Sequence, residues 1–184
     1  MNTFHIMRHG QSKANVAGII VSCPESDRDG DYGLTEAGRE QARAAAAGSG
    51  LLADTAIYSS DFARARETAE IVRARLGAPE VRVAPALRER CFGDWEGSAT
   101  ANYARVWAAD EAGRRADGVE PPNAVLDRLT TLIAGLENEH EHQQILLVSH
   151  GDPLQILLAG RLHTDPALHR RIPHLETAEI RTLP

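Results

Sequence analysis

Short apolar runs alternate with amphipathic segments along this chain, and their order predicts an α/β fold. The strand-like runs lie at residues 4–8, 55–58, 81–84 and 144–149. Segments with apolar residues three and four positions apart, typical of helices, lie at residues 36–47, 62–76 and 122–140. A repeated β-α order builds a mostly parallel sheet with helices on both faces. We therefore predict a three-layer α/β/α sandwich.

Several residues mark where these elements begin and end. Thr35 is predicted to cap the helix over 36–47, and Ser59-Ser60-Asp61 to cap the helix that ends at Gly77. Asp152 is predicted to cap a helix over 154–159, with Pro153 in its first turn. Residues 100–117 suggest a weakly patterned helix, and His174 to Leu183 a last strand near the sheet edge.

The segment 14–33 is a long polar stretch directly after the first strand. It carries glycines and the acidic run around Asp27, Asp29 and Asp31, which predicts a surface loop. Long loops beside a sheet edge often serve function, so this loop is a candidate wall or lid of a site. A solvated acidic loop without such a role remains open.

Composition narrows the class of protein. The 184 residues suit one domain over 1–184, and a net charge of −6 argues against a nucleic-acid partner. Cys23 and Cys91 form no CxxC pair, so we expect two unpaired thiols in a reducing cytoplasm. The chain has no signal region and no run of 18 apolar residues, which predicts a cytoplasmic protein without a membrane partner.

Four basic side chains follow the ends of three predicted strands. Arg8 and His9 leave the first strand, Arg64 or Arg66 leaves the second, and His150 leaves the apolar strand at 144–149. Carboxyl ends of parallel strands open onto the crevice where such folds bind ligands. Arginines would repel a metal cation, so no metal site is expected. The guanidinium fork and the helix starts instead suit a phosphoryl group.

Five sequence blocks follow one another along nearly the whole chain. They are Arg8-His9-Gly10 with Ser12 and Asn15, Leu34 to Gly38, Ser60 to Ala69, Leu87-Arg88-Glu89 with Phe92 to Gly97, and Ser149-His150-Gly151. In this order the blocks resemble the signatures of the histidine phosphatase superfamily, in its phosphoglycerate-mutase-like branch.

The resemblance implies roles for individual residues and a phosphoglycerate mutase-like fold. His9 would be the nucleophile that forms a phosphohistidine, and Glu89 the proton donor. Arg8, Arg64 and His150 would complete the phosphate pocket, which selects Arg64 over Arg66. Secondary phosphate contacts would come from Asn15 and the backbone of Gly151, with Gln11 and Ser12 as further candidates.

The chemistry of these roles sets expectations on protonation. Nearby cations should lower the pKa of His9 and keep it nucleophilic, and we expect His150 to be protonated. Glu89 needs a raised pKa to act as an acid. An ion pair of Glu89 with Arg88 or Arg90 is the structural alternative.

Hydrolysis is favoured over phosphoryl transfer between hydroxyls. Mutases of the family carry an inserted basic segment after the glutamate block, and residues 99–118 of this chain contain none. The chain also has Gly118-Val119-Glu120 where many members have Gly-Glu-Ser, which puts a substrate contact in doubt. A phosphomutase, a protein phosphatase and a non-catalytic interaction protein remain the alternatives.

The predicted phosphatase function also leads to predictions about partners and cofactors. A small phosphorylated metabolite is the expected substrate, no cofactor is implied, and the last strand at a sheet edge leaves room for a homodimer. The remaining histidines are expected to be solvated rather than ligands; they include His140, His142, His163 and His169.

Overall fold

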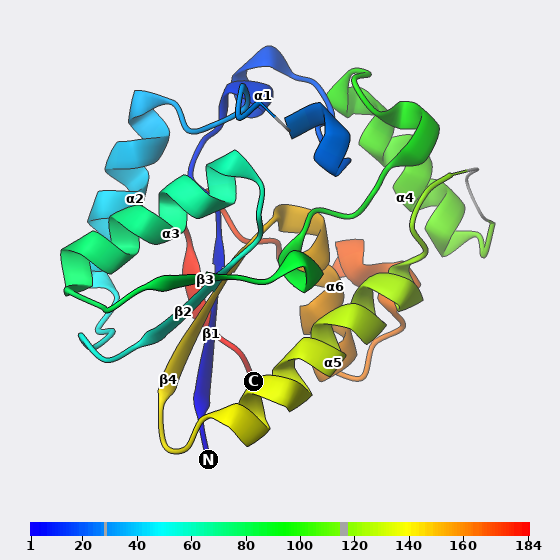
Figure 1. The fold of residues 1–184 in the computed structure, drawn as a ribbon. Helices are drawn as coiled ribbons and strands as arrows, with labels where there is room; N and C mark the ends of the chain where they lie inside the picture. Colours follow the sequence, from blue (N-terminus) through cyan, green and yellow to red (C-terminus); the bar gives the residue numbers. More distant parts are fainter. Residues whose placement is uncertain (28, 115–117) are drawn as a thin grey trace.

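The computed structural model describes residues 1–27, 29–114 and 118–184, and it contains the predicted sandwich (Figure 1). The central sheet has the strand order β3-β2-β4-β1-β5. Its first four strands are parallel neighbours: β1 (Thr3–Arg8), β2 (Ala56–Ser59), β3 (Val81–Val83) and β4 (Gln144–Ser149). The last strand, β5 (Ile180–Thr182), pairs antiparallel with β1 at the edge.

Helices cover both faces of the sheet. One face is covered by α2 (Glu36–Gly48) and α3 (Ala63–Leu76), the other by α5 (Pro122–Glu139) and α6 (Gly151–Arg161) (Figure 1). In β4, Ile145 and Leu147 pack in the core under α5 and α6, whereas Leu146 and Val148 pack under α2 and α3. A strand buried on both faces needs a continuous apolar run, which explains the pattern at 144–149.

The remaining helices are short and lie in the connections. The α-helical ones are α1 (Lys13–Ala17) and α4 (Tyr103–Glu111). The 3-10 turns are η1 (Pro24–Asp27), η2 (Pro85–Leu87), η3 (Gly93–Trp95), η4 (Thr100–Asn102) and η5 (Pro166–Arg171). The helix predicted over 100–117 is thus split between η4 and α4, and its end at 115–117 lies outside the described residues.

Two predicted helix caps are wrong. Thr35 does cap α2, accepting from the backbone N–H of Gly38. Phe62 occupies the cap position of α3 without a side-chain bond, and Asp27 from the long loop instead accepts from the N–H of Ala63 at 2.6 Å. Helix α6 begins at Gly151, and the Asp152 carboxylate turns into a buried polar network. The Ala63 N–H and the Asp152 carboxylate thus both bond to residues distant in sequence, and not to the neighbours that the local pattern predicts.

The last strand is shorter than predicted. Only Ile180–Thr182 pairs with β1, because Ala178 adopts a left-handed conformation with φ of 61°. Its N–H lies 3.1 Å from the carbonyl oxygen of Arg8 and 3.2 Å from that of His9. The segment before β5 therefore closes over the end of β1 instead of extending the sheet.

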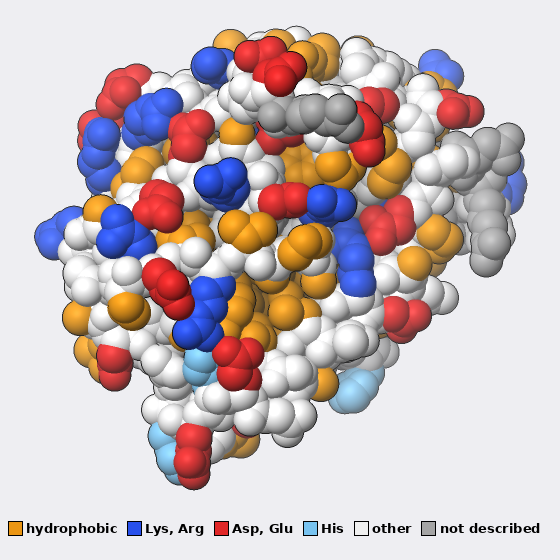
Figure 2. All heavy atoms as spheres, viewed as in Figure 1, with side chains coloured by type: hydrophobic (Ala, Val, Ile, Leu, Met, Phe, Trp, Pro, Cys, Tyr) orange, Lys and Arg blue, Asp and Glu red, His pale blue; other side chains and the backbone are white. Residues whose placement is uncertain are grey.

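Acidic and basic side chains are interspersed over the face shown in Figure 2, with apolar side chains gathered between β3 and α5. Among the described residues, no helix combines the length and apolar character needed to cross a bilayer.

Candidate active site

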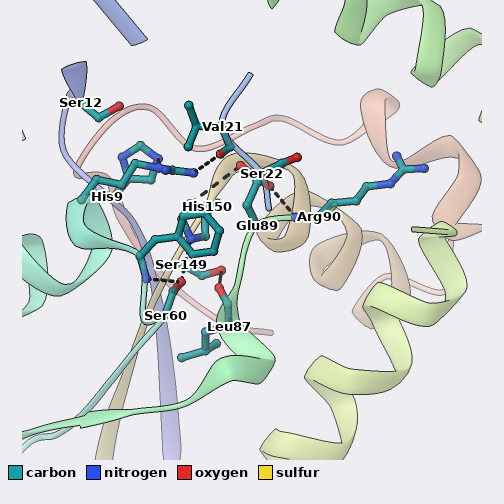
Figure 3. A network of polar contacts seen from close by, with 12 residues as sticks. His9, Ser12, Val21, Ser22, Ser60, Leu87, Glu89, Arg90, Ser149 and His150 are labelled. Atoms are coloured by element: carbon teal, nitrogen blue, oxygen red, sulfur yellow. Dashed lines mark hydrogen bonds and ion pairs between the residues drawn. The ribbon is translucent and has the colours of Figure 1, made fainter. Parts of the chain in front are cut away.

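The predicted basic residues meet at the carboxyl end of the sheet. Arg8, His9 and Arg64 line a cavity of about 240 Å³ together with Glu89. The ring of His150 lies below His9 in Figure 3, and the centroids of the two rings are 5.2 Å apart. Arg64 is 3 % exposed, whereas Arg66 lies on the exposed side of α3. The structure thus places Arg64, and not Arg66, at the site.

His9 is held in one tautomer. Its Nδ1 lies 2.7 Å from the carbonyl oxygen of Gly10, which can only accept, so Nδ1 carries the proton. Nε2 is left with its lone pair and accepts from Arg64 Nε at 3.2 Å. Burial lowers the pKa of His9 well below its usual value, and Arg64 and Arg8 lower it further. His9 is therefore a neutral imidazole with Nε2 directed to the site.

Three buried donors around the cavity have no partner within the described residues. They are Arg8 Nε, Arg64 Nη1 and His150 Nδ1. Some of the other donors of the two arginines are engaged: Arg8 Nη1 donates to Leu175 O, and Arg64 Nη2 donates to Val21 O. A buried donor without an acceptor costs about 1–3 kcal/mol, so this arrangement suits an oxygen-rich anion that supplies the acceptors.

The surroundings of His150 in the ligand-free protein oppose the protonated form expected from the sequence. Its ring is fully buried, and burial lowers its pKa well below the usual value, with Arg64 and His9 adding to the effect. Ser60 Oγ contacts Nε2 at 2.9 Å from below (Figure 3). Sequence position shows that His150 follows a strand, but it does not show how far the ring is removed from water.

Glu89 has the environment that an acid needs. Burial raises its pKa to about 7, and the neighbouring Asp152 carboxylate raises it while Arg64 opposes the shift. Its Oε1 accepts from the backbone N–H of Arg90, and its Oε2 lies 3.9 Å from His150 Nδ1. Arg88 pairs with Asp61, and Arg90 pairs with Asp110 and Asp152. The alternative of a Glu89 ion pair with Arg88 or Arg90 is therefore excluded.

The loop that carries Glu89 is anchored on both sides. Ser149 Oγ at the end of β4 donates to Leu87 O at 2.7 Å (Figure 3). The Arg90 side chain, 1 % exposed, donates to Glu120 O at 2.7 Å in addition to its carboxylate partners. Glu120 itself pairs with Arg128. The Gly118-Val119-Glu120 departure thus places a structural carboxylate behind the site.

Of the residues predicted as secondary phosphate contacts, three line the cavity and one lies outside it. Asn15, Ser12 and Gly151 line the cavity, and Ser12 caps α1 through a capping box with Asn15. Gln11 is not among the residues that line the cavity, and its Oε1 accepts from Thr35 Oγ1 at 2.8 Å. Gln11 as a phosphate contact stays a prediction. Its backbone packs against Gly38, where a Cβ would clash.

The long loop over 14–33 forms a wall of the cavity, which is one of the two alternatives predicted for it from the sequence. Ala14, Ile19 and Val21 line it, and the Val21 carbonyl fixes Arg64. Asp27, 8 % exposed, ties the loop to the start of α3.

Sequence reasoning missed a second group of lining residues. Tyr103 and Trp107 from α4 stack at 5.3 Å between centroids, and the guanidinium carbon of Arg170 lies 3.8 Å from the Trp107 centroid. His169, expected to be solvated, is fully buried and contacts Asp152 through Nε2 at 3.0 Å. Tyr103 and Trp107 lie one turn apart on α4, but the Trp107–Arg170 contact joins segments 63 positions apart, so no periodic signal marks that contact.

Cys23 and Cys91 are free thiols, as expected, but they are not isolated. Their sulfur atoms lie 3.0 Å apart, joining the long loop to the loop after Glu89. Within the described ranges, no group of three or more His, Cys, Asp or Glu side chains is arranged to hold a metal ion.

Fold and site together define an α/β protein with an anion pocket lined by arginine and histidine. Residues 4–183 match the histidine phosphatase superfamily (branch 1), and the chain belongs to this family. The predicted resemblance is confirmed.

Relatives with named activities include phosphatases and a mutase-like protein. A glucosyl-3-phosphoglycerate phosphatase of Mycolicibacterium vanbaalenii is 32 % identical over 170 residues, covering 85 % of this chain and 72 % of that protein. Phosphoglycerate mutase-like protein 4 of Arabidopsis thaliana is 31 % identical over 161 residues, covering 83 % and 67 %. The native structure of a mycobacterial glucosyl-3-phosphoglycerate phosphatase matches with a TM-score of 0.81 at 30 % identity, covering 97 % of this chain and 87 % of that one. The family and its phosphatase members support phosphoric monoester hydrolysis as the reaction class.

Proposed function

We propose that this protein hydrolyses small phosphomonoesters through a phosphohistidine on His9, with Glu89 as general acid and base. The observation that carries the proposal is the set of three unpartnered buried donors around a neutral, fixed imidazole. Arg8 Nε, Arg64 Nη1 and His150 Nδ1 would each donate to an oxygen of the phosphoryl group. The same dianion would raise the pKa of His150 and favour its charged form while substrate is bound.

In the first step His9 Nε2 attacks phosphorus. The P–N bond forms, the P–O bond to the alcohol breaks, and its electron pair stays on the leaving oxygen. Protonated Glu89 gives its proton to that oxygen, so a neutral alcohol departs. Arg64 Nε, which holds the His9 lone pair at 3.2 Å in the ligand-free protein, must shift its donation to the phosphoryl group.

In the second step water releases the phosphoryl group. Glu89, now ionised, takes a proton from water as the water oxygen attacks phosphorus and the P–N bond breaks. Inorganic phosphate leaves, and His9 and Glu89 regain their starting forms. No metal ion takes part in either step, so an excess of chelator is expected to leave the rate unchanged.

Turnover of p-nitrophenyl phosphate by His9→Ala tests the proposal. The variant is expected to lose at least about 10³-fold in kcat/KM, because no other group supplies the attacking lone pair. His163→Ala, on the exposed turn after α6, is the matched control and should match the wild type. Full turnover by His9→Ala would overturn the proposal, and a requirement for a priming bisphosphate would favour the phosphomutase alternative.

A further inference from the structure

The outer part of the cavity carries a cation that the proposed chemistry does not use. Beyond the phosphate donors the lining includes Thr100, Tyr103, Trp107, Arg170 and His174. From this arrangement we propose that Arg170 binds a carboxylate on the alcohol part of the substrate, so that the substrate class is phosphorylated hydroxy acids. The inference rests on the proposed function, which fixes where the phosphoryl group and the alcohol lie.

Arg170 is held in place by neutral groups. Its guanidinium stacks on Trp107, and its Nη1 donates to the side-chain oxygen of Gln155, which is 1 % exposed. Trp107 is fixed in turn, because its Nε1 donates to Asp152 Oδ1 at 2.9 Å. The guanidinium is thus oriented before any ligand arrives, which reduces the entropy lost on binding.

No carboxylate within the described residues pairs with Arg170. Other arginines do have carboxylate partners: Arg90 pairs with Asp110 and Asp152, and Arg171 pairs with Glu111. Arg170 is half-buried, and burial lowers its pKa, with Arg8 acting in the same direction and Asp152 against it. A half-buried cation that repels Arg8 and lacks a counter-ion gains more from a bound anion than an exposed arginine would.

The aromatic residues argue against a nucleobase in this position. Trp107 already has two stacked neighbours, Tyr103 and Arg170. The guanidinium of Arg170, which lies over the Trp107 ring, favours a planar anion, because its N–H groups match the two oxygens of a carboxylate. The cavity volume of about 240 Å³ favours a compact alcohol.

The test compares two alcohols that differ in one group. 3-Phosphoglycerate carries a carboxylate where glycerol 3-phosphate carries a hydroxymethyl group. The wild type is expected to prefer 3-phosphoglycerate by about 10- to 100-fold in kcat/KM, the range of a hydrogen bond to a charged group. Arg170→Gln should reduce this ratio to near 1, mainly through KM for the acid, and Arg170→Lys should retain part of it.

Arg171→Gln is the matched control, because Arg171 is exposed and outside the cavity lining. It should keep the wild-type ratio. Equal use of both substrates by the wild type, or an unchanged preference in folded Arg170→Gln, would overturn the proposal. The ratio is taken within each variant, so a general loss of activity does not imitate the effect. Failure of the wild type to hydrolyse p-nitrophenyl phosphate would instead refute the proposed function.

Discussion

Replacing Glu89 by glutamine should stabilise the protein at alkaline pH while it slows catalysis. Burial raises the pKa of Glu89 from 4.5 to about 7. Between about pH 4.5 and 7 the Glu89 carboxyl is ionised in the unfolded chain but still protonated in the folded protein. Glu89 therefore makes the free energy of unfolding fall as the pH rises through this range. Above pH 7 both states are ionised, and the folded state carries the full cost of the buried charge.

The size of this cost follows from the shift. Each unit of pKa difference corresponds to about 1.4 kcal/mol, so the charge of Glu89 costs about 3 kcal/mol above pH 8 and under 1 kcal/mol at pH 5. The advantage of Glu89→Gln over the wild type should therefore grow by about 2–3 kcal/mol between pH 5 and pH 8.5. Urea unfolding of both proteins at the two pH values measures this difference.

Catalysis should change in the opposite direction. The kcat/KM of the wild type on an alkyl phosphate is expected to fall tenfold per pH unit above about 7, as Glu89 loses its proton. Glu89→Gln should lack this pH dependence, and its kcat/KM should be lower than that of the wild type by about 10²- to 10⁴-fold. Asp94→Asn, an exposed carboxylate in the same loop, is the control and should leave both properties unchanged. A stability gain independent of pH, or an alkaline limb that survives in Glu89→Gln, would refute the reasoning.

Two further predictions concern the neighbours of the site. Arg64→Gln removes the donors to His9 Nε2 and Val21 O and should lower kcat/KM by about 10²- to 10³-fold, whereas Arg66→Gln should stay within about twofold in the same aryl phosphate assay. Equal losses in both variants would contradict the assignment of Arg64. Oxidation by a disulfide reagent should link Cys23 to Cys91, whose sulfurs lie 3.0 Å apart, and raise the unfolding free energy by about 2–4 kcal/mol. Peptide mass mapping and urea unfolding check this, and the same gain in Cys91→Ser would contradict it.

The sequence could predict which strand ends carry the chemistry, because that information is local. Apolar runs that end in Arg8-His9 and in Ser149-His150 place side chains at one sheet edge whatever the loops do. The choice between Arg64 and Arg66 was different, since both lie at the start of α3. Arg64 is buried because Val21 from a distant loop accepts from it, and periodicity contains no trace of that contact.

Burial and pairing between distant segments could not be predicted. The lowered pKa of His150 depends on the complete removal of its ring from water. The burial of His169 is accompanied by its contact with the carboxylate of Asp152. Arg170 and Trp107 lie 63 positions apart in the printed sequence, in segments without strong patterning. Their stacking is a property of the packed structure, so the sequence alone could not place Arg170 in the cavity beside Arg8 and Arg64.

Trapping of the covalent intermediate tests the central claim most directly. Glu89→Gln lacks the base for the water step, so with p-nitrophenyl phosphate, whose leaving group needs little protonation, a phosphorylated enzyme should accumulate. Rapid quenching at alkaline pH and peptide mass spectrometry should locate one phosphoryl group on His9. A phosphoryl group on another residue, or release of p-nitrophenol with no phosphorylated enzyme under single-turnover conditions, would contradict the account.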